Sequence, residues 1–284
     1  MKARWGIFLM PPLVVSFLLF IIPQAVFLRM SFFKDLGLGQ VGSKLELANY
    51  IQFFRDPFYL KSLGLTAYLS TIVVTLALLF GFPVGYVLAR MRSRWASVLL
   101  AVIMAASFIT VIIKVLGLII IVGANGPVNR LLLALRIIDS PMQMLWNRTG
   151  VVIGLLHYTL PLIIVMLFSM VRTIPRSLEE AAQIHGASRW RVFWRVVIPL
   201  SLPGLLGSAL MVFNMSMGAF TSAVLLGGGK VLTLPVLIQR TVILETRYGM
   251  GAVLSGILLV TVLFVNLLSI QSAVRVRGAM RPGA

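Results

Sequence analysis

The stretch 177–203 contains the residues whose types and spacing most clearly indicate chemistry. Ser177 is followed three residues later by Glu180, the spacing of a capping box that satisfies the free N–H groups at a helix start. Gly186 predicts the end of this helix, because glycine readily adopts the left-handed conformation that follows a helical segment. A short polar helix that ends in a glycine turn indicates a docking element for another protein, with no catalytic residues in it.

A second helix is expected after this turn, with Ser188 as its N-cap. Its aromatic residues recur at i, i+3 and i+4 and therefore share one face; they are Trp190, Phe193 and Trp194. Pro199 and Pro203 are expected to mark the start of the apolar segment that follows. Both helices would then lie beside the membrane surface.

The first helix has small side chains, Ala181 and Ala182, which would let a partner surface approach closely. Glu179 and Glu180 complement the positive end of the helix dipole. Considered alone, the same residues also fit an ordinary amphipathic surface helix in which Glu180 only caps its own backbone.

The composition of the 284-residue chain predicts an integral membrane protein. Hydrophobic residues make up 60% of it, charged residues 11%, and the mean hydropathy is +1.02. Soluble domains are typically about 45–50% apolar and about 25% charged. The net charge of +18 is then explained by basic residues that flank the spans and meet anionic headgroups, rather than by nucleic-acid binding. The absence of cysteine and the presence of only two histidines argue against a metal site.

Six apolar windows predict an all-α fold with six transmembrane helices, because a backbone exposed to lipid must satisfy its own hydrogen bonds. The windows are 6–28, 62–89, 96–122, 150–171, 200–226 and 250–271. The first is interpreted as a retained span rather than a cleaved signal peptide, since it is long and contains three prolines. Turn and cap signals in 30–61 and 123–149 predict short helices that do not span the membrane.

The basic residues near the span ends predict the orientation of the chain. The short segments 90–94 and 275–281 carry only basic charges, whereas most acidic residues fall on the other side of the predicted spans. We therefore expect a multi-pass protein of the bacterial inner membrane with both termini in the cytoplasm. The 177–203 loop, between the fourth and fifth spans, would lie on the same side.

The pattern in this loop resembles the EAA loop of ABC importer permeases, E-A-A-x-x-x-G followed by an I-x-L-P-like element. The matching residues are Glu180, Ala181, Ala182, Gly186, Ala187, Phe193, Ile198, Pro199 and Pro203. One departure is His185, where relatives more often carry aspartate or an aliphatic residue, so the role of His185 stays open. The resemblance extends over nearly the whole chain and implies the type I, MetI-like importer fold.

This resemblance implies a coupling helix at 178–186 that docks in a groove of a separate ATPase. The residues assigned to ATPase coupling are Ser177, Glu180, Ala181, Ala182, Gly186, Ala187, Arg189 and Phe193. Arg189 and Arg191 could reach either acidic groups of the ATPase or lipid phosphates. The implied partners are a second homologous permease, an ATPase dimer that binds ATP and magnesium, and a periplasmic solute-binding protein; this chain itself would hold no cofactor.

The resemblance also implies three segments and a subgroup. The segments are an N-terminal helix with a periplasmic part at 1–61, a permease core at 62–271 and a cytoplasmic tail at 272–284. Looser similarities to permeases of the spermidine/putrescine type occur at 126–129, 218–221, 225–230 and 248–252. That subgroup also includes importers of opines, phosphonates and amino-acid-like solutes.

Polar residues inside the apolar windows are candidates for the solute pathway, because ionisable groups are costly in lipid. The candidates are Lys114, His157, Tyr158, Asn214, Ser216 and Thr221. Each has a structural alternative. Lys114 could extend to the headgroups if its span ended near Ile113, His157 and Tyr158 could be a helix-packing pair, and Asn214 and its neighbours, with Asn266, could form interhelical hydrogen bonds.

The acidic residues are absent from all six windows, which favours an anionic or zwitterionic solute over a polycation. This absence also argues against the alternative of a self-sufficient secondary transporter or channel, which typically needs buried carboxylates for ion coupling. A membrane enzyme finds no support in a nucleophile, di-acid or metal cluster. The chain lacks the phosphate-binding loop G-x-x-x-x-G-K-[ST], so it is not expected to hydrolyse ATP.

Overall fold

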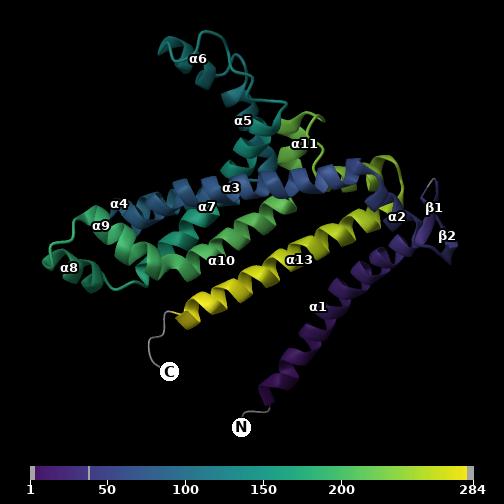
Figure 1. Ribbon diagram of the computed structural model, residues 1–284, viewed down its shortest axis with the longest axis horizontal. Helices are drawn as coiled ribbons and strands as arrows, with labels where there is room; N and C mark the ends of the chain where they lie inside the picture. Colours follow the sequence, from purple (N-terminus) through teal and green to yellow (C-terminus); the bar gives the residue numbers. More distant parts are fainter. Residues whose placement is uncertain (1–3, 38, 280–284) are drawn as a thin grey trace. The chain divides into compact units, whose positions relative to one another are not determined.

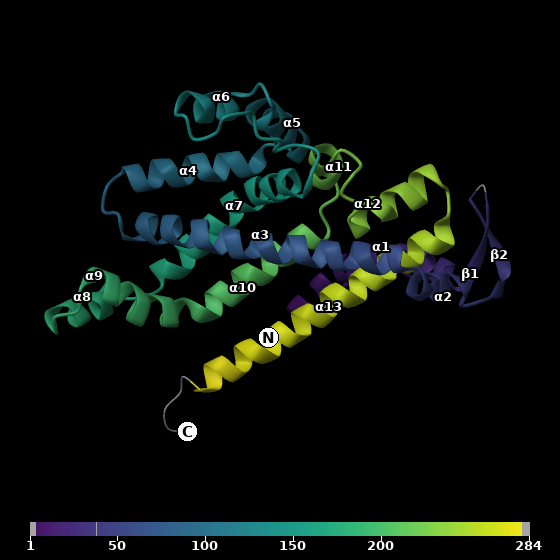
Figure 2. The same ribbon diagram turned by 45° about the horizontal axis from the view of Figure 1, so that its top comes forward.

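The computed structural model describes residues 4–37 and 39–279, with side chains described for residues 9–37 and 39–271. Helices dominate, as the composition predicts (Figures 1 and 2). The chain divides into two compact units, one formed by 1–63 and 234–261 and the other by 64–233 and 262–284. Two long helices, α3 (Pro57–Arg90) and α13 (Tyr248–Ala279), contribute residues to both units.

The first unit also contains a small hairpin that the sequence did not predict. Besides parts of α3 and α13, the elements of the first unit are α1 (Arg4–Arg29), a 3₁₀ turn (Met30–Phe32), β1 (Phe33–Gly37), β2 (Gln40–Leu45), α2 (Ala48–Arg55), α12 (Leu234–Gln239) and a π-helical turn (Arg240–Leu244). β1 and β2 pair antiparallel. Gly37 and Gly39 both have positive φ, so glycine supplies the backbone conformation that the tight connection needs.

The regular elements in the described part of the second unit are all helices. Its elements are α4 (Trp95–Phe108), α5 (Val111–Val122), α6 (Pro127–Ala134), α7 (Arg148–Arg172), α8 (Arg176–Ile184), α9 (Arg189–Val192), a π-helical turn (Phe193–Val197), α10 (Ile198–Met217) and α11 (Thr221–Gly227). The central helix α7 packs against α4, α10 and α11. Figures 1 and 2 show α8 and α9 together at one end of this unit.

Six helices are long and apolar enough to cross a membrane, in agreement with the predicted number. Their bounds are Leu9–Phe32, Pro57–Arg90, Val111–Ala134, Arg148–Arg172, Arg189–Met217 and Tyr248–Gln271. Their outward side chains, such as Leu19 and Ile120, are 72% and 73% exposed, as expected for surfaces that face lipid. The predicted number of spans is therefore confirmed, but the third candidate span is Val111–Ala134 rather than 96–122, and Trp95–Phe108 is a shorter apolar helix.

Two predicted spans are interrupted. The window 96–122 consists of α4 and α5, which are separated by Ile109 and Thr110 in extended conformation. The window 200–226 is α10 followed by a break at 218–220 and then α11. The residue types in an apolar run do not indicate such breaks, because the helices on both sides of each break face an apolar environment.

Small residues let α7 approach its neighbours in the second unit. A Cβ atom on Gly85 of α3 would lie 3.1 Å from the backbone nitrogen of Phe168, and one on Gly154 would collide with the side chain of Leu226. Close backbone approach of this kind is a main source of helix association in membranes. These glycines therefore set the distances of α3 and α11 from α7.

Asn129 organises the loop between α5 and α7. Its side chain is fully buried, donates hydrogen bonds to the carbonyls of Gly123 and Met142 at 3.0 Å each, and accepts one from the Met142 amide at 2.9 Å. The predicted short helix in this loop is present as α6, which carries Asn129, but α6 lies within the candidate span Val111–Ala134. Asn129 satisfies backbone groups that would otherwise be buried without partners.

Asp35 connects the hairpin to the start of α13 within the first unit. Its carboxylate accepts hydrogen bonds from the amides of Gly249 and Met250 at 2.7 and 2.9 Å, and Arg247 lies 3.8 Å away. A carboxylate at a helix N-terminus satisfies free N–H groups and complements the helix dipole. The hairpin thus serves as the cap of a transmembrane helix that begins more than 200 residues later in the chain.

Replacing Asp35 with alanine should lower the stability of the purified protein by about 1–2 kcal/mol, because two capping hydrogen bonds at a helix start are lost. Thermal unfolding in detergent measures the effect. Glu46→Ala removes an acidic charge from an exposed position near the hairpin and should change little. Equal unfolding temperatures for the two variants would show that Asp35 does not hold the start of α13.

Candidate functional site

The helix α8 begins at Arg176, directly after Pro175, with no side-chain hydrogen bond at its cap. Ser177 is therefore inside the helix, and the predicted capping box of Ser177 with Glu180 is wrong. Pro175 is extended and begins the helix without a capping side chain. Within this helix, Glu179 is buried and Glu180 is exposed.

The end of α8 agrees with the prediction from Gly186. Gly186 has a φ of +83°, its amide donates to the carbonyl of Gln183 at 2.9 Å, and the Ala187 amide donates to the carbonyl of Ala182 at 3.0 Å. These two bonds form a Schellman motif, which satisfies the last carbonyls of a helix. Gly186 therefore ends α8 by a defined turn.

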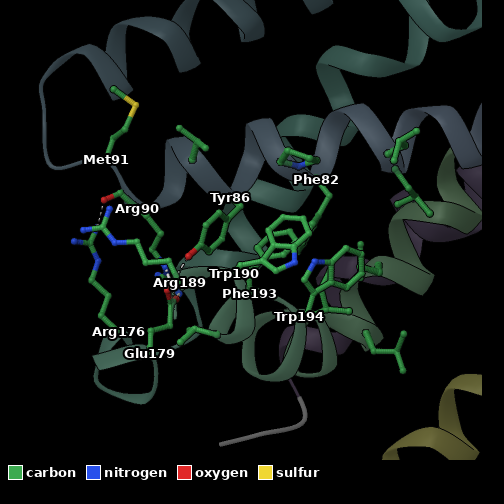
Figure 3. Close-up of a pocket in the computed structure, with 18 of the residues that line it drawn as sticks. Phe82, Tyr86, Arg90, Met91, Arg176, Glu179, Arg189, Trp190, Phe193 and Trp194 are labelled. Atoms are coloured by element: carbon green, nitrogen blue, oxygen red, sulfur yellow. Dashed lines mark hydrogen bonds and ion pairs between the residues drawn. The ribbon is translucent and has the colours of Figure 1, made fainter. Parts of the chain in front are cut away.

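Glu179 is the buried acid that holds α8 to the end of α3. Its carboxylate accepts hydrogen bonds from the Tyr86 hydroxyl at 2.9 Å and from Nε of Arg90 at 2.7 Å, and it forms an ion pair with the Arg90 guanidinium. Arg90 also donates to the carbonyl of Ile174 at 3.1 Å. Figure 3 shows the Tyr86 hydroxyl and the Arg90 side chain converging on Glu179.

Arg176 completes this connection from the opposite direction. Its guanidinium donates to the carbonyls of Ala89 and Arg90, at 3.3 and 3.1 Å, at the C-terminal end of α3. A cation there also complements the negative end of the helix dipole. Tyr86, Arg90, Arg176 and Glu179 are called the anchor network below. The sequence did not predict that Glu179 pairs with Arg90 and Tyr86, because the only local signal was an acidic residue beside Glu180.

The second helix begins as predicted but does not end as predicted. The Ser188 hydroxyl accepts a hydrogen bond from the Arg191 amide at 3.4 Å, which confirms Ser188 as the N-cap. The helix then continues through the π-helical turn into α10, so Pro199 does not separate it from the fifth span. Pro199 lies in the first turn of α10, directly after the π-helical turn, so its missing N–H falls where the hydrogen-bond pattern of the helix changes.

The aromatic face of this helix forms a cluster with α3. Phe193 lies 5.5 Å from Phe82 and 5.2 Å from Tyr86, measured between ring centroids. The Trp190 and Trp194 rings lie 6.0 and 5.6 Å from Phe193. Phe193 is therefore a packing residue between α3 and α9 rather than part of an outward surface, whereas Trp190 and Trp194 are largely exposed.

The other predicted coupling residues lie on the outside of α8 and the following turn. Glu180 and Ala181 are exposed, Ala182 and Ala187 are partly buried, and Arg189 is exposed. Ile184 is 84% exposed, although it is a large apolar side chain. An exposed face of this composition, on a helix held from behind by Glu179, has the character of a docking surface.

The predicted pathway residues do not form one cluster. Lys114 is 9% exposed, on an α5 helix that continues to Val122 rather than ending near Ile113, whereas His157 is exposed on α7. Tyr158 is partly buried on the same helix, next to His157.

The remaining pathway candidates have structural surroundings. Asn214 and Asn266 exchange two amide hydrogen bonds, at 3.1 and 3.0 Å, which confirms the interhelical alternative for both. Ser216 is buried near the end of α10, and Thr221 is the first residue of α11. In the part of the chain with described side chains, no group of three or more potential metal ligands is present.

The comparisons with known proteins agree with this geometry. The sequence profile of the family "Binding-protein-dependent transport system inner membrane component" matches residues 81–277. The spermidine/putrescine transport system permease protein PotB of Haemophilus influenzae is 28% identical over 86% of this chain and 85% of its own length. PotB of Escherichia coli is 30% identical over 74% of this chain and 76% of its own length.

A similar fold occurs in a solved structure. The bacterial alginate ABC transporter, in complex with an alginate pentasaccharide-bound periplasmic protein, contains a chain with a TM-score of 0.74, 20% identity and 96% coverage of both chains. This likeness confirms the fold of an ABC importer permease. The chain therefore belongs to the family of binding-protein-dependent transport system inner membrane components, and it is a multi-pass permease subunit of an ABC importer rather than an enzyme.

Proposed function

We propose that α8 is the coupling helix, which docks in a groove of an ATPase subunit and receives its motion. The exposed face of α8 supports this proposal, because Glu180 and Ile184 lie on it while Glu179 holds the opposite face to α3. The matching residues of the EAA pattern lie on α8 and on the segment that follows it. The Glu180 carboxylate would then be available for a basic group of the ATPase.

The anchor network explains how motion of α8 would reach the spans. Arg90 and Arg176 connect α8 to the end of α3 through charged hydrogen bonds, which are shorter and stronger than neutral ones. After the Gly186 turn, the helix that begins at Arg189 continues into α10 without interruption. A displacement of α8 would therefore move α3 and α10 together, and this pair of connections is the observation that carries the proposal.

The complete transporter would contain further subunits. We infer a second homologous permease, two ATPase subunits that bind ATP and magnesium, and a periplasmic solute-binding protein. The alginate transporter with its bound periplasmic protein supports the last of these. Both termini and α8 would face the cytoplasm, since the basic segments 90–94 and 275–281 favour that side.

The solute would be small and either anionic or zwitterionic. None of the seven acidic residues lies within the six spans, whereas Lys114 is buried in one of them. A buried cation without a neighbouring carboxylate favours a solute that carries negative charge. Mass spectrometry of ligand released from the binding protein of this system tests this inference, and a polyamine would contradict it, although PotB relatives are named for polyamines.

Replacing Glu180 with alanine should reduce ATPase stimulation by the loaded binding protein about tenfold, since a charge-assisted hydrogen bond contributes about 1.5–3 kcal/mol. Membrane insertion should be unchanged, because Glu180 is exposed. The measurement uses the complete transporter in proteoliposomes. Asp139→Ala removes an exposed acid from the loop between α6 and α7 and serves as the control. Equal stimulation in the two variants would refute the docking role of α8.

A further inference from the structure

A large groove lies within the second unit, between the end of α3, α8, α9 and the first half of α10. Its volume is about 1250 Å³. Small-molecule pockets usually enclose about 300–1,000 Å³. Figure 3 shows arginine side chains at one end of this groove and aromatic rings farther along it. It is called the arginine–aromatic groove below.

The part of the groove that extends along the spans is apolar. Its walls include Leu78 and Phe82 from α3, and Leu202, Leu205 and Ala209 from α10. Both helices lie within candidate membrane spans, so this part of the groove faces the hydrocarbon region. A ligand there needs apolar chains rather than hydrogen-bonding groups, because unsatisfied polar groups are costly in lipid.

The other end of the groove is cationic. Arg90, Arg92, Arg176 and Arg189 line it, together with Glu179 and Glu180. Arg90 neutralises Glu179, and Arg176 is occupied by backbone carbonyls. Among the described side chains, no carboxylate forms an ion pair with Arg92 or Arg189, and both are exposed. The end of the groove therefore has positive charge available for an anion.

Two exposed tryptophans mark the depth of the groove in the membrane. Trp190 is 70% exposed and Trp194 is 51% exposed, and both line the groove between its cationic and apolar parts. Tryptophan is enriched at the level of the lipid headgroups, where one side of the ring is apolar and the N–H is hydrated. The groove thus crosses from the headgroup level into the hydrocarbon region.

We propose that the arginine–aromatic groove binds one anionic phospholipid, with its phosphate between Arg92 and Arg189 and its acyl chains along Leu205 and Ala209. An amphipathic anion matches both ends of the groove. Basic pockets between transmembrane helices are suited to anionic headgroups. The assignment to the cytoplasmic leaflet rests on the orientation proposed above, whereas the binding itself does not depend on it.

The bound lipid would lie against α3, α8 and α10, the three helices that the anchor network and the continuous helix connect. The acyl chains would fill space that side chains leave open, and the phosphate would offset the unpaired positive charge at the cationic end. The lipid would thereby act as a structural component of this part of the permease.

The test measures tryptophan quenching by brominated lipids in the complete transporter, reconstituted in phosphatidylcholine nanodiscs. Brominated phosphatidylglycerol should quench more strongly than brominated phosphatidylcholine at the same mole fraction. A variant with Trp190 and Trp194 both replaced by phenylalanine gives the signal of the other tryptophans. If the two lipids quench the tryptophan fluorescence equally after this subtraction, the groove is not an anionic lipid site.

Arg189→Gln should weaken the apparent affinity for brominated phosphatidylglycerol about fivefold, the effect of about 1 kcal/mol for one basic residue near anionic lipid. The matched control is Arg191→Gln, two positions along the same short helix, because Arg191 does not line the groove. Equal weakening in both variants would indicate general surface attraction instead of a site. Excess inorganic phosphate should not displace the lipid, since it lacks the acyl chains; displacement would overturn the proposed mode.

A second measurement distinguishes lipid from protein in the groove. The chain contains no cysteine, so Ala209→Cys introduces a single thiol into its apolar part. A photoreactive group on that thiol should cross-link to phospholipid, and cross-linking to the second permease instead would overturn the proposal. These readouts involve neither transport nor ATP hydrolysis. Failure of the lipid proposal would therefore leave the α8 docking test unaffected, and the reverse also holds.

Discussion

Replacing Glu179 with alanine should destabilise the protein by about 3–5 kcal/mol, because removing one partner of a buried ion pair leaves the other charge uncompensated. The side chains of Arg90 and Glu179 are only 15% and 10% exposed. The variant also leaves the Tyr86 hydroxyl without its acceptor. We expect a clearly lower unfolding temperature of the detergent-purified protein, together with loss of ATPase stimulation in the complete transporter.

The neighbouring acid provides the control for this prediction. Glu180→Ala should change stability by less than about 0.5 kcal/mol, since Glu180 is exposed. The two adjacent glutamates should therefore separate two roles: Glu179 holds α8 in place, and Glu180 faces the proposed partner. The assignment of these roles would be reversed if Glu180→Ala were the variant that unfolded at lower temperature.

A double-mutant cycle tests whether Arg90 and Glu179 act as a pair. The double alanine variant should be less destabilised than the sum of the single variants by roughly 0.5–3 kcal/mol, because each single change already removes the interaction. Additive effects would mean that each residue acts alone, and the anchor network would then lose its central contact.

Replacing Gly186 with valine should abolish the coupling of ATP hydrolysis to uptake. Gly186 has a φ of +83°, and a β-branched residue is strained in this left-handed region by about 1–3 kcal/mol. No atom would lie within 4 Å of an added Cβ, so the penalty arises from the backbone alone. The strain would open the Schellman turn and disorder the end of α8.

The matched control is Gly186→Asn, because asparagine tolerates the left-handed conformation. We expect near-normal solute uptake and ATPase stimulation with asparagine, an intermediate result with alanine and loss of both with valine. Proteoliposomes with the complete transporter allow both measurements. Equal activity of the valine and asparagine variants would show that the turn geometry at Gly186 does not matter for coupling.

The local chemistry of residues 177–203 predicted part of the site correctly. The roles of Gly186 and Ser188 were predictable because a left-handed turn and an N-cap depend only on residues within one helical turn. The capping box failed because Ser177 satisfies the pattern, yet the chain already enters the helix at Arg176. The hydrogen bonds of the Arg176 side chain to the carbonyls of Ala89 and Arg90, more than 80 residues earlier, hold the start of the helix in place.

The structure also changes the interpretation of two candidate residues. Phe193 matches the family pattern, but its contacts with Phe82 and Tyr86 make it a packing residue. Asn214 is paired with Asn266 across two helices, so its polarity is used for helix association. Residue type indicated polarity or aromaticity in each case, whereas the use of that property depends on which helix lies opposite.

The sequence alone determined the membrane class, the six spans, the acid-free interior and the helix with its glycine turn, because these follow from composition and from short-range periodicity. Only the tertiary structure decided that Glu179 faces α3 while Glu180 faces outward, that the apolar window 96–122 is broken at 109–110, and that Asp35 caps α13. Each of these depends on groups that are distant in the chain and become neighbours only when the helices pack. The residues around Glu180 therefore determine their own helix and turn, whereas contacts with α3 hold that helix in place.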